Sequence, residues 1–214
     1  LSANIGNFDS PKQHVEQEVK QFIECEFEEI ISVNDKLWDS NRAKGKWVKM
    51  LHGNNRPDYD ETDIIIWIDG NVTITNPGFA QMMVDKLEED EGYDIAISYH
   101  PYRHMTGEEY YYILTEIEKG NTYLKSRYDP DKLKAEREII GDYYPLYWCG
   151  CFAYYNKYKF HKFAKDWFEH ELKYAMFDQC SFSYFAGEHG MDLNAFEFNG
   201  FYKNDYLTVT SHLK

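Results

Sequence analysis

The chain has 214 residues, of which 37 are acidic and 23 are basic, so its formal net charge is −14 with histidine neutral. A surface of this charge repels the phosphate backbone of DNA and RNA, and we expect no nucleic-acid partner. Hydrophobic residues make up 43% of the chain, with 19 Tyr and 14 Phe, which is enough for a sizeable core. No apolar run approaches the roughly 20 residues of a membrane helix, so no membrane span is expected.

The N-terminal residues 1–12 lack the basic and apolar regions of a secretion signal. Two of the four cysteines, Cys149 and Cys151, form a Cys-x-Cys pair, which is neither a zinc-ribbon nor a thioredoxin spacing. These features favour a cytoplasmic protein with reduced cysteines.

The first elements predict a strand and a helix packed on a sheet. Residues 2–9 predict a short strand that runs into a turn of small polar residues, and Pro11 ends it. Between Val15 and Ile31 apolar residues recur every three or four positions, which indicates a helix, or a helix and a strand.

Residues 39–52 (DSNRAKGKWVKMLH) are a basic segment in an acidic chain. Asp39 or Ser40 can cap a helix here. Four cations follow within eight residues: Arg42, Lys44, Lys46 and Lys49. They form either a solvated helix face or a binding site for an anion, most simply a diphosphate. Arg42 is nearest the helix N-terminus, where peptide N–H groups also favour anions.

The stretch 62–77 (TDIIIWIDGNVTITNP) contains the most informative pattern. The apolar run from Ile64 to Ile68 predicts a strand buried on both faces, as in a parallel sheet. It ends at Asp69-Gly70-Asn71, where two oxygen-bearing side chains could hold a divalent cation at the carboxyl end of the strand. The alternative is an ordinary hairpin turn, because Asp-Gly and Gly-Asn are common turn pairs.

The remaining elements alternate between helices and strands. The apolar patterns predict strands at residues 93–99 and 145–155. They predict helices after Pro77, at residues 106–119 and at residues 157–173. A further helix is predicted to start at Asp178 and to stop before Gly190. Residues 121–142 predict a helical connection broken at Asp129-Pro130. A strand, a helix and a strand form a βαβ unit. We therefore predict a single α/β domain over residues 1–214, with a central, mostly parallel twisted sheet flanked by helices.

Several short motifs occur in the order found in one enzyme family: residues 3–9 (ANIGNFD), Asn41-Arg42 with Lys44, residues 67–71 (WIDGN), residues 100–103 (HPYR) and Asp178-Gln179. On these motifs the chain resembles the glycosyltransferases of the GT-A fold. Within them it looks most like the small glycosyltransferase domain encoded by chlorella viruses. The motifs span nearly the whole chain.

The resemblance implies a single GT-A-type domain with a nucleotide-binding part at about 1–100 and a sugar and acceptor part at about 101–214. It implies a UDP-sugar donor, of the glucose type or a deoxyhexose such as rhamnose, and a glycan or glycoprotein acceptor. It also implies Mn²⁺ as the cofactor, with Mg²⁺ as the alternative. In a virus such an enzyme would act in capsid glycan synthesis in the host cytoplasm.

The resemblance also implies roles for individual residues. The metal ligands would be Asp69 and Asn71, which occupy the family's Asp-x-Asp motif, together with His212; a frayed terminal residue is the alternative for His212. The nucleotide would contact Ala3, Asn4, Ile5, Gly6, Asp9, Arg42, Lys44, Ile68, Asp69 and Gly70. The sugar would contact His100, Arg103, Trp148, Cys149, Gly150, Asp178 and Gln179.

If the reaction inverts the anomeric carbon, a carboxylate must act as the base on the acceptor hydroxyl. The candidates are Asp178, then Asp192 and Asp205. Because Asp178 opens a helix, its alternative role is an N-cap. The alternative role for Cys149 is that of a buried packing residue in a strand. Two other functions stay open: a nucleotide-sugar hydrolase or pyrophosphorylase-like enzyme, and a non-catalytic carbohydrate-binding domain.

Overall fold

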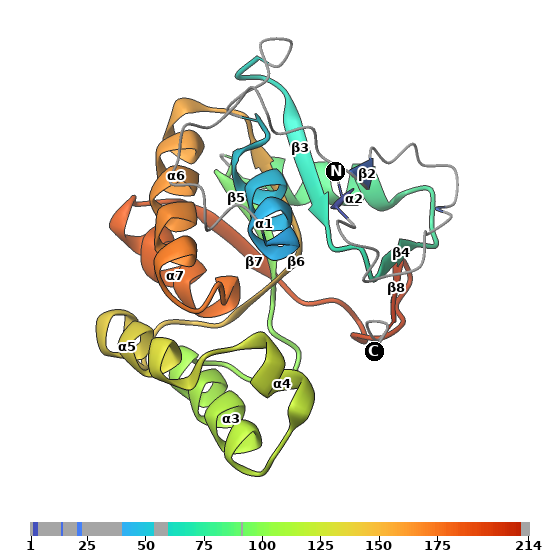
Figure 1. The fold of residues 1–214 in the computed structure, drawn as a ribbon. Helices are drawn as coiled ribbons and strands as arrows, with labels where there is room; N and C mark the ends of the chain where they lie inside the picture. Colours follow the sequence, from blue (N-terminus) through green and yellow to red (C-terminus); the bar gives the residue numbers. More distant parts are fainter. Residues whose placement is uncertain are drawn as a thin grey trace.

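The computed structural model describes residues 2–3, 14, 21–22, 40–53, 60–90 and 92–210 (Figure 1). Its centre is a four-stranded sheet in the order β3 (Ile64–Ile68), β6 (Tyr147–Tyr155), β5 (Ile95–Tyr99) and β7 (Leu193–Phe196). Two short pairs of strands lie outside it: β4 (Val72–Ile74) with antiparallel β8 (Leu207–Val209), and β1 (Ser2–Ala3) with parallel β2 (Gln21–Phe22).

The described helices are α1 (Asn41–Leu51), α2 (Phe79–Glu88), α3 (Thr106–Glu118), α4 (Thr122–Arg127), α5 (Pro130–Ile140), α6 (Tyr158–Lys173) and α7 (Asp178–Glu188). Ser40 caps α1, because its Oγ accepts a hydrogen bond from the N–H of Ala43 at 3.0 Å. Asp129 caps α5 through the N–H of Asp131 at 2.9 Å, and Pro130 follows as the first helical residue. The predicted helix break at Asp129-Pro130 is therefore confirmed.

The prediction of an α/β chain is confirmed, but the prediction of a mostly parallel sheet is wrong for the described strands. β6 runs antiparallel to both of its neighbours, β3 and β5, and only β5 and β7 pair in parallel. β3 and β5 run in the same direction, yet β6 separates them, so they are not the adjacent strands of a simple βαβ unit. A continuous apolar run reports that both faces of a strand are covered, and it carries no information about direction.

Both faces of β3 are indeed covered by other elements. Ile65 and Trp67 pack in a core with α1, α6 and α7, whereas Ile68 packs in a second core with α2, β4 and β8. Figure 1 shows α1 in front of the sheet, with α6 and α7 beside it. The alternation of side chains along an extended strand produces this division.

Helices α3, α4 and α5 form a separate unit between β5 and β6, in the lower part of Figure 1. Tyr110, Leu133 and Ile140 from this unit form a third core with Phe177 and Cys180 at the start of α7. This packing fixes the first turn of α7. In the described part of the chain, no helix combines the length and the apolar character needed to cross a membrane.

Candidate functional site

The Asp69-Gly70-Asn71 segment is a turn that leaves the carboxyl end of β3. The N–H of Asp69 donates to the carbonyl of Gly150 on β6 at 2.8 Å, and the N–H of Val72 donates back to the carbonyl of Asp69 at 3.0 Å. The turn does not form a β3–β4 hairpin, because β4 pairs with β8. The segment therefore carries its side chains from the central sheet toward the small β4–β8 pair.

Hydrogen bonds fix the side chains of Asp69 and Asn71. Asp69 Oδ1 accepts from the indole of Trp67 at 2.8 Å and lies 3.1 Å from the ammonium of Lys49. Asn71 Nδ2 donates to the carbonyl of Thr210 at 2.9 Å. Among the described hydrogen bonds, none uses Asp69 Oδ2 or Asn71 Oδ1, and the Asp69 side chain is 33% exposed. Within the described part of the chain, one oxygen of each residue therefore remains for a ligand.

Behind Asp69 lies a buried network of charged side chains. Lys46 and Lys49 project from one side of α1, and both ammoniums contact the same oxygen of Asp178, at 2.6 and 2.7 Å. Lys46 also lies 3.6 Å from Glu171 on α6. Lys49 thus bridges the carboxylates of Asp69 and Asp178, and it links the exposed turn to the start of α7.

The network sets the protonation of its members. Burial alone would raise the pKa of Asp178, but the ammoniums of Lys46 and Lys49 outweigh it and hold this pKa well below its ordinary range. Burial raises the pKa of Glu171 to about 7, against the opposing effect of Lys46. A carboxylate held by two ammoniums is a weak proton acceptor, so this arrangement suits Asp178 to positioning the lysines.

Arg42 and Lys44, the predicted phosphate contacts, belong to the same helix as these lysines. The guanidinium of Arg42 donates to the carbonyls of Arg127 and Met176, at 2.5 and 2.7 Å, and lies 4.6 Å from the ring centre of Tyr128. It joins α1 to the end of α4 and to the segment before α7. Lys44 is half-buried.

His100 and Arg103, two predicted sugar contacts, lie together after β5. Nδ1 of His100 accepts from the N–H groups of Tyr102 and Arg103, at 3.3 and 3.1 Å. Burial, with the charge of Arg103, lowers the pKa of His100 to about 4, so this imidazole is neutral at pH 7. Arg103 pairs with the carboxylate of Glu109 and lies 4.3 Å from the ring centre of Tyr112.

Three other predicted sugar contacts, Trp148, Cys149 and Gly150, occupy consecutive positions on β6. Trp148 and Cys149 are buried, and the Cys149 thiol donates to the carbonyl of Asp178 at 3.7 Å. The indole of Trp148 folds over Gly150, where a Cβ atom would lie 2.4 Å from Nε1. Gln179 is half-buried in the first turn of α7. Trp148, Cys149 and Gln179 therefore lie largely in the interior beneath the site, and little of them is exposed to a ligand.

The other two candidate bases, Asp192 and Asp205, lie away from this network. The carbonyl of Asp192 accepts from the N–H of Asp94 at 2.9 Å, at the start of β5 and β7. Asp192 therefore lies at the N-terminal ends of β5 and β7, whereas Asp69 lies at the C-terminal end of β3, on the opposite side of the sheet. Asp205 is exposed in the loop before β8, and its carbonyl accepts from Asn76 at 3.0 Å.

Several predicted site residues lie outside the described part of the chain: Asn4, Ile5, Gly6, Asp9 and His212. The backbone of Ala3 belongs to β1. Ile68 and Gly70, predicted to contact the nucleotide, are buried on either side of Asp69.

The described residues would provide an incomplete cation site. Among them, no group of three or more His, Cys, Asp or Glu side chains is arranged to hold a metal ion. Asp69 and Asn71 each offer one oxygen without a partner among the described residues, which is the right donor type for Mn²⁺ or Mg²⁺ but too few donors for about six ligands. The donor set therefore fits a cation that arrives with further oxygens from a bound diphosphate and water.

The sequence placed Lys46 and Lys49 in a basic segment that could bind a diphosphate, but it did not predict their contacts with Asp69, Asp178 and Glu171. The helical pattern of α1 could have indicated that Lys46 and Lys49 lie close to the protein interior. Trp47 and Met50 mark the buried face of α1, and Lys46 and Lys49 each lie one position before them. No local pattern links these lysines to Asp178, which is 129 residues from Lys49.

Comparisons of the chain with models of protein families, with curated proteins and with solved structures found no match.

Proposed function

We propose that the protein is a glycosyltransferase that moves a sugar from a UDP-sugar to a glycan, with Mn²⁺ or Mg²⁺ bound together with the donor. The main support is the position of Asp69: its partly exposed carboxylate follows a central strand, next to Asn71 and 3.1 Å from the buried ammonium of Lys49. This juxtaposition of carboxylate, amide oxygen and positive charge suits a diphosphate and its cation. The sequence motifs support the choice of a glucose-type or deoxyhexose donor.

In this proposal each described residue has a physical role. Asp69 Oδ2 and Asn71 Oδ1 would hold the cation, which would supply positive charge to the diphosphate leaving group. Trp67 fixes the orientation of the Asp69 carboxylate through its indole N–H, at 2.8 Å. Lys49 adds a fixed positive charge on the protein side of the carboxylate, and Asp178 keeps that ammonium in position at 2.7 Å. No described carboxylate is assigned as the base.

Calorimetric titration with UDP, in the presence and absence of Mn²⁺, tests the proposal directly. We expect UDP to bind only with the cation, and Mn²⁺ alone to bind weakly because the protein provides few ligands. Asp69→Ala should abolish the Mn²⁺-dependent binding. Asp85→Ala is the matched control, since Asp85 lies on the exposed side of α2. Unchanged binding by Asp69→Ala would refute the site.

Product analysis separates transfer from the two alternative functions. Incubation with a set of UDP-sugars and Mn²⁺ should yield UDP together with a glycosylated acceptor. Release of free sugar at the same rate with and without an acceptor would indicate a hydrolase. A protein that binds saccharides but neither UDP nor Mn²⁺ would be a carbohydrate-binding domain.

A further inference from the structure

Three aromatic side chains form an exposed cluster beyond the end of β5. Tyr102 and Phe201 have ring centroids 5.7 Å apart, Phe201 and Tyr202 are 5.1 Å apart, and Tyr102 and Tyr202 are 6.3 Å apart. Tyr102 is 54% exposed and Tyr202 is 60% exposed, whereas Phe201 is half-buried against Trp148, with ring centroids 5.0 Å apart. Phe201 is the base of the cluster, and the two tyrosines form its surface.

The backbone holds this aromatic cluster in a fixed position. Gly200 has a φ of 95°, a conformation that other residues rarely adopt, and a Cβ atom there would lie 2.8 Å from the carbonyl of Lys203. Asn204 donates to the carbonyl of Gly200 and accepts from two following N–H groups. The carbonyl of Tyr202 accepts from Val209 on β8 at 2.9 Å. Such a turn presents preorganised rings, which lose little freedom when a ligand binds.

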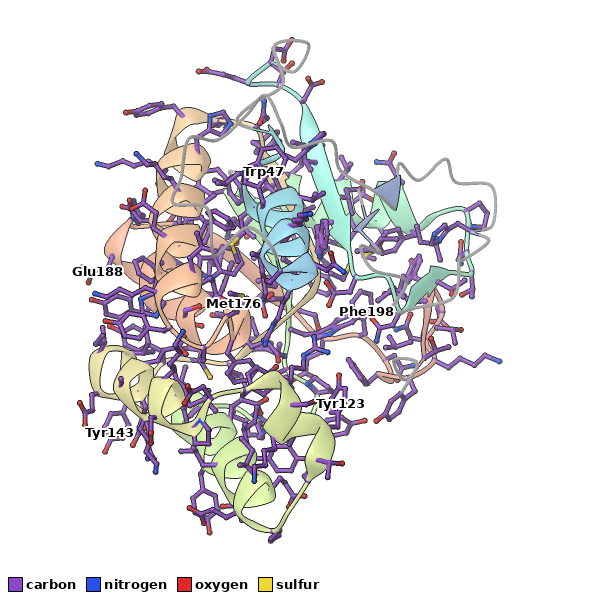
Figure 2. The ribbon with its side chains drawn as sticks, viewed as in Figure 1. Trp47, Tyr123, Tyr143, Met176, Glu188 and Phe198 are labelled. Carbon is purple, nitrogen blue, oxygen red and sulfur yellow. The ribbon has the colours of Figure 1, made fainter. Side chains whose placement is uncertain are left out.

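The cluster adjoins the Asp69–Asn71 turn through two sets of contacts. Phe201 packs on Trp148, whose indole covers Gly150, and the carbonyl of Gly150 binds the N–H of Asp69. On the second side, β8 continues from Val209 to Thr210, whose carbonyl and N–H bind the side chain and carbonyl of Asn71. Figure 2 shows Phe198, which also packs on Trp148, on the segment that leads from β7 toward β8.

We propose that Tyr102, Phe201 and Tyr202 form a saccharide-binding surface on which a pyranose ring of the acceptor glycan stacks. The C–H groups on one face of a pyranose are attracted to the negative face of an aromatic ring. The tyrosine hydroxyls can exchange hydrogen bonds with sugar hydroxyls. The Tyr102 and Tyr202 rings are tilted by 43°, so they form an open surface and no parallel slot for a flat base.

The assignment of the sugar as an acceptor rests on the proposed glycosyl transfer, but saccharide binding itself does not. A stacked pyranose would need neither UDP nor a cation. The site can therefore be tested on the protein alone, and its result is independent of the UDP titration.

Saturation-transfer NMR with methyl glycosides of glucose, galactose, mannose, xylose and rhamnose tests the surface without nucleotide or metal. We expect transfer to the C–H protons of at least one glycoside, and about tenfold weaker binding by Tyr102→Ala/Tyr202→Ala, as expected for the loss of two aromatic contacts. Tyr202→Phe should retain the transfer to ring protons, because it keeps the aromatic face.

Tyr143→Ala is the control for removal of an exposed tyrosine. Tyr143 is 90% exposed and lies on the side of the molecule near α5, away from the segment that carries Phe198 (Figure 2). This variant should bind the glycosides like the wild type. Absence of transfer from the wild-type protein to any glycoside, or equal transfer from the double variant, would overturn the proposal. Displacement of the glycoside by uridine alone would also overturn it and would assign the surface to the nucleotide base.

Discussion

Lys49 on α1 and Asp178 on α7 form a buried ion pair, with Nζ 2.7 Å from Oδ2 and side chains that are 6% and 12% exposed. Lys46 contacts the same oxygen at 2.6 Å, so one carboxylate compensates two ammoniums. A buried charge pair contributes little net stability compared with an apolar pair, but removal of one partner leaves an uncompensated charge. The pair therefore couples the position of α7 to the turn at Asp69.

Substitution of Asp178 tests this compensation. We expect Asp178→Asn to lower the free energy of unfolding by roughly 3–5 kcal/mol, because Lys46 and Lys49 lose the carboxylate that lies closest to both of them. Urea denaturation, followed by tryptophan fluorescence, measures the change. Asp85→Asn, on an exposed helix face, should stay within about 0.5 kcal/mol of the wild type.

A second substitution distinguishes lost charge compensation from lost packing. Asp178→Asn/Lys46→Met removes one of the two ammoniums and should recover part of the lost stability. A single variant within about 1 kcal/mol of the wild type would contradict a compensating role for this carboxylate.

The pH dependence of stability reports on Glu171. Its side chain is buried, and its pKa is raised from 4.5 to about 7. Between these values the folded state binds the proton more tightly than the unfolded chain, so this group lowers stability as pH rises through that range. We expect the difference in stability between Glu171→Gln and the wild type to shift by about 3 kcal/mol in favour of the variant from pH 4.5 to pH 8.

Urea denaturation at several pH values checks this prediction. The side-chain amide of Glu171→Gln retains an oxygen that can accept a hydrogen bond from the Ser181 hydroxyl. Ser181 in turn accepts from the Trp167 indole at 2.9 Å, so unchanged tryptophan fluorescence of the folded variant would show that the local structure is preserved. A difference between the two proteins that is constant over this pH range would show that Glu171 has the same pKa in the folded and unfolded states.

Substitution of Gly150 tests its close contact with the indole of Trp148 on the same strand, β6. A Cβ atom would lie 2.4 to 2.8 Å from three atoms of the Trp148 indole, so Gly150→Ala must displace this ring. We expect a loss of about 1–3 kcal/mol in the free energy of unfolding. Gly45→Ala is the matched control: nothing lies within 4 Å of its Cβ position, and alanine in a helix should stabilise by about 0.5–1 kcal/mol. Equal effects of the two substitutions would contradict the packing of Trp148 on Gly150.

The elements themselves could be predicted from the sequence because their causes are local. The run Ile64–Ile68 predicted β3, Asp129-Pro130 predicted the break between α4 and α5, and Asp178 was correctly predicted as the start of α7. Side-chain periodicity, caps and proline act over a few residues, so a single sequence contains them.

The direction and order of the strands could not be predicted in this way. The apolar pattern of β6 showed that the strand is buried, but the insertion of β6 between β3 and β5 depends on contacts between distant parts of the chain. A buried strand has the same composition in either direction, because its pattern reflects the two layers that cover it.

For the site, the sequence determined the residues with suitable chemistry, and the tertiary structure decided which of them meet. Asp69 and Asn71 are two positions apart, so their proximity follows from the chain alone. The bridge from Asp69 through Lys49 to Asp178 joins three elements, and only their packing brings the charges within 3.1 Å. A charged side chain takes its partner from the space around it, and folding brings that partner from any part of the sequence.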